Sequence, residues 1–411
     1  MEMKVRYWIW FWLAPVAGAQ PISTLVDEAL RNNREILAAQ KKVEALRQRP
    51  ARESSLPDPT LSFAWTSNGG PWPGAGLGID ATSNIGVMVS QEVPAPGKRK
   101  LRGEIADKEA SAAYDEYLAA RLRVVSRLKQ AYHELHHAAV AIGFVDRYQE
   151  LLNDMLRISE ARYAVGRGAQ QDILRAQTQL AIFATERVRF EQEREAKQIE
   201  INALLSRPQG GRIEVPAEMT AGPMPAPLEE VLAEARAHSP LVERDRDVIQ
   251  SDELAASLAR KDYAPDYTVS GGYFNQGGMP PMWQARVDFK LPAYFWRKQR
   301  AAVNEQEANA SQARHEYAGT LVEIEAGIRE QYSAAEASRN LVDLYEKSVI
   351  PEARLAYESA LAGYQAGRGD FIALFTSFTS VLDYELMDHE EVMRFHVALA
   401  KLEELTGVEQ K

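Results

Sequence analysis

Four short segments of the chain alternate between apolar residues and polar or small ones. The first two cover 60–66 and 84–90, and the other two cover 267–273 and 283–291. A period of two is typical of a β-strand with one apolar and one polar face. The pattern alone fits a soluble sheet with one solvated face as well as a sheet that faces lipid.

Most of the remaining chain has a helical pattern. From 98 to 165 there is no proline and little glycine, and apolar residues recur at steps of three and four. Such a narrow stripe is typical of a coiled-coil seam. A helix of that length measures roughly 100 Å, whereas the mean helix has about 11–12 residues. Comparable patterns cover 169–206, 228–261, 298–365 and 370–406.

Helices of this length do not fit a globular core, so they predict a tube or a cytoskeletal coiled coil. They leave few apolar helices on which the four strands could pack, which favours strands that face lipid. Four strands cannot close a barrel, so a membrane sheet of this kind requires several chains to share one barrel. We expect a mainly α protein with a small β part.

The chain is an internal duplication. The hexad YAVGRG at 163–168 returns as YQAGRG at 364–369, and Pro-Asp pairs precede the strands of both halves. A repeat of this size dictates the fold. We expect a first repeat at 20–215 with one helix, two strands and two long helices. A proline-rich linker at 216–227 then leads to a second repeat at 228–411 with the same order.

The N-terminus has the features of a secretion signal. Lys4 and Arg6 precede an apolar run at 7–17, and Ala17-Gly18-Ala19 resembles a cleavage site. The alternative is a transmembrane anchor, but the run falls short of the ~20 residues that span a bilayer. We therefore expect a signal peptide at 1–19, cleaved after Ala19.

Composition excludes several classes of function. The net charge is −10, and an acidic chain without a basic stripe argues against nucleic acid as a partner. The chain has no cysteine, which excludes disulfides, thiolate metal sites and a lipid-modified N-terminal cysteine. We find no nucleophile–base arrangement and no cofactor motif, so we predict a protein that is not an enzyme and holds no cofactor or resident metal.

The two repeated hexads are candidate docking sites. A glycine at each helix end can take the left-handed conformation, and a second glycine leaves bare backbone that another protein could approach closely. The alternative is a helical turn that binds nothing. The predicted docking residues are Tyr163, Gly166, Arg167, Gly168, Tyr364, Gly367, Arg368 and Gly369.

These features together resemble the TolC family of outer-membrane efflux proteins. The resemblance rests on the signal peptide, the duplicated unit, Pro-Asp-Pro at 57–59 and Pro-Gly-Lys-Arg at 96–99. The length of the chain and the QEVPAPGKR stretch at 91–99 are most similar to the heavy-metal branch, which exports cobalt, zinc and cadmium or copper. The resemblance covers essentially all of the mature chain.

The resemblance implies a homotrimer in the outer membrane of a Gram-negative bacterium. Four strands per chain would form one twelve-stranded barrel, and the helices would continue it as a periplasmic tunnel. The hexads would be the tips that meet an adaptor protein bound to an inner-membrane proton-driven (RND-type) pump. The expected lipid-facing residues are Leu61, Phe63, Trp65, Ile85, Val87, Val89, Val287 and Phe289.

Relatives in this family often carry an acidic ring just after the tip. Asp172 matches that position in the first repeat, whereas the second repeat has Ala373 there, with Asp370 one turn earlier. We expect Asp172 to belong to a tunnel gate, with Arg167 as a candidate partner. The alternative is an acidic residue that only favours the helix start.

One motif points to a different class. The segment HELHH at 133–137 satisfies the HExxH pattern of zinc proteases, with His133, Glu134 and His137 in the required positions. Such a site needs a third ligand and an open cleft, and the match lies in the middle of a predicted long helix. Solvated residues or weak metal contact fit better, and a zinc hydrolase stays as an alternative.

Three functions therefore remain open. The first is the exit duct of an efflux system, which could serve heavy-metal cations, drugs or type I protein secretion. The second is a periplasmic adaptor or scaffold, which would have a single helical hairpin between β-rich domains. The third is the zinc hydrolase.

Overall fold

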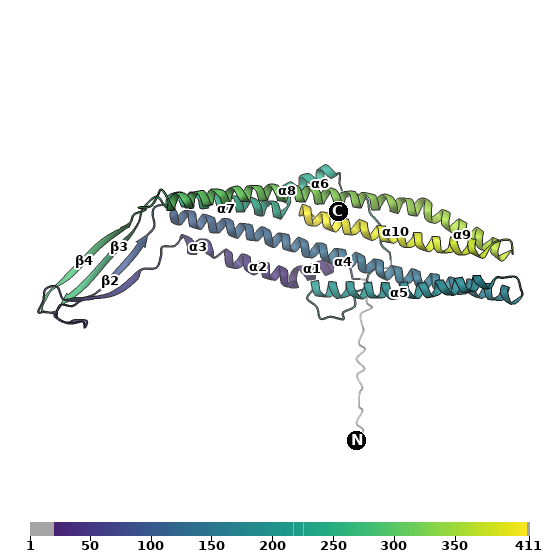
Figure 1. The fold of residues 1–411 in the computed structure, drawn as a ribbon, viewed down its shortest axis with the longest axis horizontal. Coiled ribbons are helices and arrows are strands. Elements are labelled where there is room, and N and C mark those ends of the chain that lie inside the picture. The colour runs from purple at the N-terminus through teal and green to yellow at the C-terminus, as the bar shows by residue number, and fades with distance from the viewer. Residues whose placement is uncertain (1–19, 217, 225, 409–411) are drawn as a thin grey trace, which may run out of the picture. The chain divides into compact units, whose positions relative to one another are not determined.

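The computed structural model describes residues 20–216, 218–224 and 226–408, so the predicted signal peptide and its cleavage site lie outside it. The described part of the chain is mainly helical, with one small antiparallel sheet, as predicted (Figure 1). It separates into two compact units. One comprises 20–37, 121–235 and 326–408, and the other 38–120 and 236–325. Both halves of the predicted duplication contribute to each unit.

The second unit contains the sheet. Its strands are β1 (Thr60–Thr66), β2 (Asn84–Val93), β3 (Asp266–Gln276) and β4 (Met279–Lys290), in the order β1-β2-β3-β4. All three pairings are antiparallel. Within this sheet β1 and β4 each have one strand neighbour, which leaves one hydrogen-bonding edge of each unpaired.

The strand register gathers the apolar side chains on one face. Phe63 lies opposite Val87, which in turn lies opposite Tyr273, and Tyr273 lies opposite Trp283. The eight residues predicted to face lipid all belong to this face and are exposed, with Phe63 at 74% and Phe289 at 62%. The residues between them lie on the opposite face, where the hydroxyl oxygens of Ser90 and Ser270 are 2.9 Å apart. The sheet therefore presents one exposed apolar face and one mainly polar face, on which Phe274 is buried.

Two helical hairpins form the core of the first unit, the helical unit (Figure 1). One consists of α4 (Lys98–Ala164) and α5 (Gln170–Leu204), and the other of α9 (Ile350–Gln365) and α10 (Phe371–Thr406). Each helix has a narrow apolar seam that is buried only by packing against neighbouring helices. Their seams meet in one buried cluster that includes Val145, Leu152, Phe183, Leu374 and Phe378.

Two of the predicted helices are interrupted at proline. The stretch 228–261 divides into α6 (Leu228–His238) and α7 (Pro240–Lys261), because Pro240 has no N–H to continue the first helix and instead starts the second. The stretch 298–365 divides into α8 (Lys298–Leu344), a π-helical turn η1 (Tyr345–Val349) and α9. Pro351 follows this turn, and the wider turn removes the clash between its ring and the preceding carbonyl groups.

The helices before the first strand are α1 (Ile22–Asn32), α2 (Arg34–Leu46) and α3 (Arg49–Ser54). The break between α1 and α2 is set by Asn33, whose side-chain oxygen accepts N–H groups of Glu35 at 2.9 Å and Ile36 at 3.2 Å. Its amide nitrogen donates to the carbonyl oxygen of Leu204 at 2.8 Å. This buried asparagine both caps α2 and ties it to the end of α5.

No helix in the described residues combines the length and the apolar composition that a membrane-crossing helix needs.

Candidate gate and docking site at the helical tips

The two hexads form the same turn. Gly166 and Gly367 have φ of 71° and 74°, the left-handed conformation expected for a glycine after a helix end. The N–H of Arg167 donates to the carbonyl of Arg162 at 2.8 Å, and the N–H of Arg368 donates to that of Gly363 at 3.0 Å. Both tips are therefore Schellman caps of the preceding helix.

The second glycine of each hexad has a structural role within the chain. A Cβ atom at Gly168 would lie 3.0 Å from the backbone nitrogen of Tyr163, and one at Gly369 would lie 2.7 Å from that of Tyr364. The space predicted to be open to another protein is therefore occupied, in the side-chain direction, by the end of the preceding helix. A larger residue at either position would displace the backbone of the tip.

The two tyrosines of the hexads differ in exposure. Tyr163 is half exposed, whereas Tyr364 is buried. The ring of Tyr364 lies 5.8 Å from that of Phe371, and the guanidinium carbon of Arg162 lies 4.2 Å from its centroid. The prediction that both tyrosines are docking residues fails for Tyr364, because its ring is used to join the two hairpins. Arg167, Arg368 and both left-handed glycines remain exposed.

Asp172 lies in the first turn of α5 and is buried. Burial raises the pKa of its carboxyl, the charge of Asp370 raises it further, and the charge of Arg175 lowers it. The pairing of Asp172 with Arg167 stays a prediction. Asp370 accepts the N–H of Ile372 at 3.4 Å and so caps α10. The hairpins bring the two carboxyl groups close enough to repel each other.

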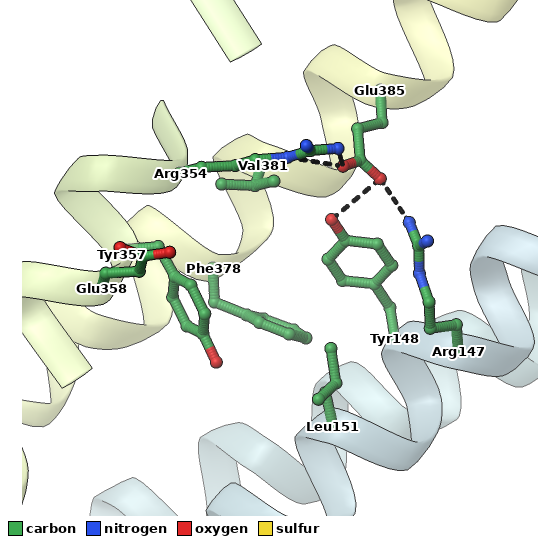
Figure 2. Close-up of a pocket in the computed structure, with 9 residues that line it drawn as sticks. All are labelled: Arg147, Tyr148, Leu151, Arg354, Tyr357, Glu358, Phe378, Val381 and Glu385. Carbon is green, nitrogen blue, oxygen red and sulfur yellow. Dashed lines mark hydrogen bonds and ion pairs between the residues drawn. The ribbon is translucent and has the colours of Figure 1, made fainter. Parts of the chain in front are cut away.

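A buried carboxylate joins three helices further along the same unit (Figure 2). Glu385 on α10 pairs with Arg147 on α4 at 2.5 Å and with Arg354 on α9 at 2.5 Å. The Tyr148 hydroxyl donates to the same carboxylate at 3.1 Å. These residues line a cavity of about 380 Å³ together with Leu151 and Phe378.

The Glu385 cluster acts as a cross-link between the hairpins. Glu385 is buried but both arginines are more than half exposed, so solvent screens each pair. Removing one arginine should therefore cost less than the ~3–5 kcal/mol typical of a fully buried pair. Burial and the neighbouring Glu385 charge raise the pKa of Tyr148, so its hydroxyl stays a donor. Sequence reasoning missed this cluster, although a glutamate among the apolar seam residues of 370–406 was a visible signal.

The side chains of the HExxH segment contact neighbouring parts of the same unit. The His133 ring stacks on His396 at 4.5 Å, and its Nδ1 atom lies 3.0 Å from the sulfur of Met219. Glu134 pairs with Lys197 at 2.6 Å, and the His137 ring meets the edge of Phe190. Among the described residues no group of three or more histidine, cysteine or acidic side chains is placed to hold a metal ion. The segment is part of the helix packing.

The fold is that of outer-membrane channels. VceC from Vibrio cholerae is 18% identical with a TM-score of 0.80, and the match covers 95% of this chain and 97% of that one. The CmeC outer-membrane channel of Campylobacter jejuni is 17% identical with a TM-score of 0.80, covering 100% and 95%. CusC, whose structures concern transmembrane channel formation, is 15% identical with a TM-score of 0.78, covering 94% and 92%.

A family model matches part of the chain. Residues 25–207 match the family described as "Outer membrane efflux protein". The matched range lies within the first predicted repeat. A search of curated proteins finds no match. The structural similarity is spread over several channels and does not single out the heavy-metal branch, which stays a prediction. Several of the neighbouring structures are described as outer-membrane channels.

The histidines packed between α4 and α10 predict that the helical unit is less stable in acid. Burial and the charge of His396 lower the pKa of His133 to about 3, and burial and the charge of His389 lower that of His136 to about 4. Both are neutral in the folded state, whereas an unfolded histidine gains a proton below about 6.5. Stability should therefore fall as pH drops from 7.5 to 5. Circular dichroism should show a lower unfolding temperature, and His133→Phe with His136→Leu should flatten the dependence.

Asp388 provides the matched control, because its pKa shift changes stability with pH in the opposite direction. Burial, with the charges of Glu346 and Glu385, raises its pKa to about 6. The folded state therefore binds a proton between about pH 4 and 6 that the unfolded state lacks, and acid relieves an unfavourable buried charge. Asp388→Asn should steepen the loss of stability in acid. An unfolding temperature that does not change with pH in the unmodified chain would contradict this account.

Proposed function

We propose that this protein is the outer-membrane exit channel of a tripartite, proton-driven efflux system. The observation that carries the proposal is the sheet, with one exposed apolar face and two unpaired edges. Large apolar side chains such as Trp283 and Phe289 are unfavourable in water but favourable against lipid. The supporting comparison is the fold shared with outer-membrane channels.

A trimer resolves the unpaired edges of the sheet. Lipid offers no hydrogen bonds to backbone groups, so a membrane sheet must close on itself. If β4 of one chain pairs with β1 of the next around a threefold axis, three four-stranded sheets form a twelve-stranded barrel without edges. The eight exposed apolar residues would then face lipid, and the face with Gln284 and Asp288 would line the lumen.

The two faces of β4 give a direct test. An arginine on the lipid face of a barrel costs about 2–4 kcal/mol at the midplane and little on the lumen side. Val287→Arg should therefore strongly reduce the heat-modifiable trimer recovered from outer-membrane fractions. Gln284→Arg is the matched control, since Gln284 is exposed on the opposite face of the same strand. Equal losses for both variants would refute the lipid-facing assignment.

The tips are proposed to dock a periplasmic adaptor that links the channel to an RND-type pump. Arg167 and Arg368 are exposed at equivalent positions of the two hairpins, beside left-handed glycines that carry no side chain. The cargo is proposed to be heavy-metal cations, on the resemblance of residues 91–99. The alternatives are drugs or a secreted polypeptide, because a wide tunnel selects little and the pump selects the cargo.

Charge reversal at the tips should separate docking from folding. In a strain that lacks the gene, the unmodified chain should restore resistance to zinc, cobalt, cadmium or copper. Arg167→Glu with Arg368→Glu should lose that resistance at least tenfold while the trimer level stays unchanged, because neither side chain supports the turn. Arg127→Glu with Arg329→Glu reverses two exposed arginines away from the tips and should retain resistance. Restored resistance to drugs alone would replace the metal cargo by drugs.

Asp172 is proposed to narrow the closed end of the tunnel. Three copies around a threefold axis, each beside its own Asp370, would form an acidic ring that attracts cations. Asp172→Asn should raise single-channel conductance in planar bilayers and weaken block by multivalent cations. Asp370→Asn keeps the cap of α10, since asparagine caps as well as aspartate, and should have a smaller effect because Asp370 lies one turn before the predicted ring position. Unchanged conductance and block in Asp172→Asn would place the gate elsewhere.

A further inference from the structure

An exposed aromatic cluster lies where β4 ends and α8 begins. Tyr294 is 70% exposed, Phe295 50% and Trp296 61%. Their rings contact one another, with Phe295 and Trp296 at 5.2 Å, and Phe295 also meets Tyr263 at 6.4 Å. Four aromatic side chains are therefore gathered on a surface where burial in the chain does not explain them.

Three cations follow directly in the sequence. Arg297, Lys298 and Arg300 are exposed, and in the described residues no acidic side chain is recorded as their ion-pair partner. The equivalent position after β2 is different. There Lys98 is buried and pairs with Asp262 and Asp266, both at 2.9 Å. The basic residues after β4 are thus free for an external anion, whereas Lys98 after β2 serves the fold.

We propose that this aromatic–basic collar (Tyr263, Tyr294, Phe295, Trp296, Arg297, Lys298 and Arg300) binds the headgroups of anionic phospholipids. The inference rests on the proposed function, which places the adjacent strands in the membrane. Tyrosine and tryptophan favour the boundary between lipid and water. Lysine and arginine near an anionic membrane surface contribute attraction of roughly a fivefold change in binding each. The basic residues therefore favour anionic lipids, and the aromatic residues set the depth of the strands in the membrane.

Tryptophan quenching tests the collar in the full chain. Replacing Trp65, Trp72 and Trp283 by phenylalanine leaves Trp296 as the reporter of the mature protein. In reconstituted vesicles, phosphatidylglycerol with brominated chains should quench Trp296 more strongly than brominated phosphatidylcholine at the same mole fraction. We expect a preference of roughly fivefold or more. The preference should weaken at high salt, because salt screens exposed charges.

The control variants remove the same number of positive charges elsewhere in the chain. Arg297→Gln, Lys298→Gln and Arg300→Gln should remove the preference, so that both lipids quench equally. Arg127→Gln, Arg212→Gln and Arg329→Gln remove three exposed arginines of the helical unit and should keep it. Equal quenching by the two lipids in the unmodified chain overturns the proposal, as does a preference that survives loss of the three collar cations.

A second reporter separates this inference from the membrane placement itself. A chain that keeps only Trp65 of the mature tryptophans reports on a strand residue that is 52% exposed. Quenching of Trp65 without quenching of Trp296 overturns the collar but leaves the proposed channel intact. Absence of quenching at both positions overturns the channel as well.

Discussion

The narrow apolar seam of each long helix is the constraint on which the helical unit depends. A helix with a seam of this kind cannot bury its apolar surface alone, so most of its stability comes from packing against other helices. The cluster around Val145, Phe183 and Phe378 forms because α4, α5, α9 and α10 contribute seams together. The caps at Gly166 and Gly367 are necessary in the same sense, because each returns the chain so that the next seam can meet the previous one.

The two repeats share a backbone fold, but their equivalent side chains make different contacts. Tyr364 is buried at the junction of the hairpins, whereas Tyr163 stays at the surface. Asp172 is buried, whereas Asp370 caps a helix. Lys98 holds the start of α4 through two aspartates, whereas the basic residues before and within α8 remain exposed. A symmetric fold therefore carries an asymmetric set of contacts, and residues at equivalent positions cannot be assumed to share a role.

The local pattern of the sequence was sufficient to locate the strands and most helix ends. The strands begin within four residues of the expected positions, because alternation and helical period are properties of neighbouring residues. The breaks before Pro240 and Pro351 were missed, since a long favourable pattern outweighed one proline. The burial of Tyr364 and the partners of Glu385 could not be predicted, because both depend on which helices pack together. A seam shows that a helix has a partner without showing which side chain of that partner it meets.

The π-helical turn at 345–349 accommodates a difference in length between the two repeats. The Glu-Tyr pair at 116–117 returns in the second repeat at 316–317, an offset of 316 − 116 = 200 residues. Tyr364 follows Tyr163 by 364 − 163 = 201. The second half thus has one more residue between these two points. In an α-helix one added residue turns everything beyond it by roughly 100°, which would rotate the seam of α9 away from its neighbours. A π turn holds one extra residue in a widened loop of the helix. The rotational phase of the second hairpin is thereby kept, so that both tips end in the same cap despite the unequal count.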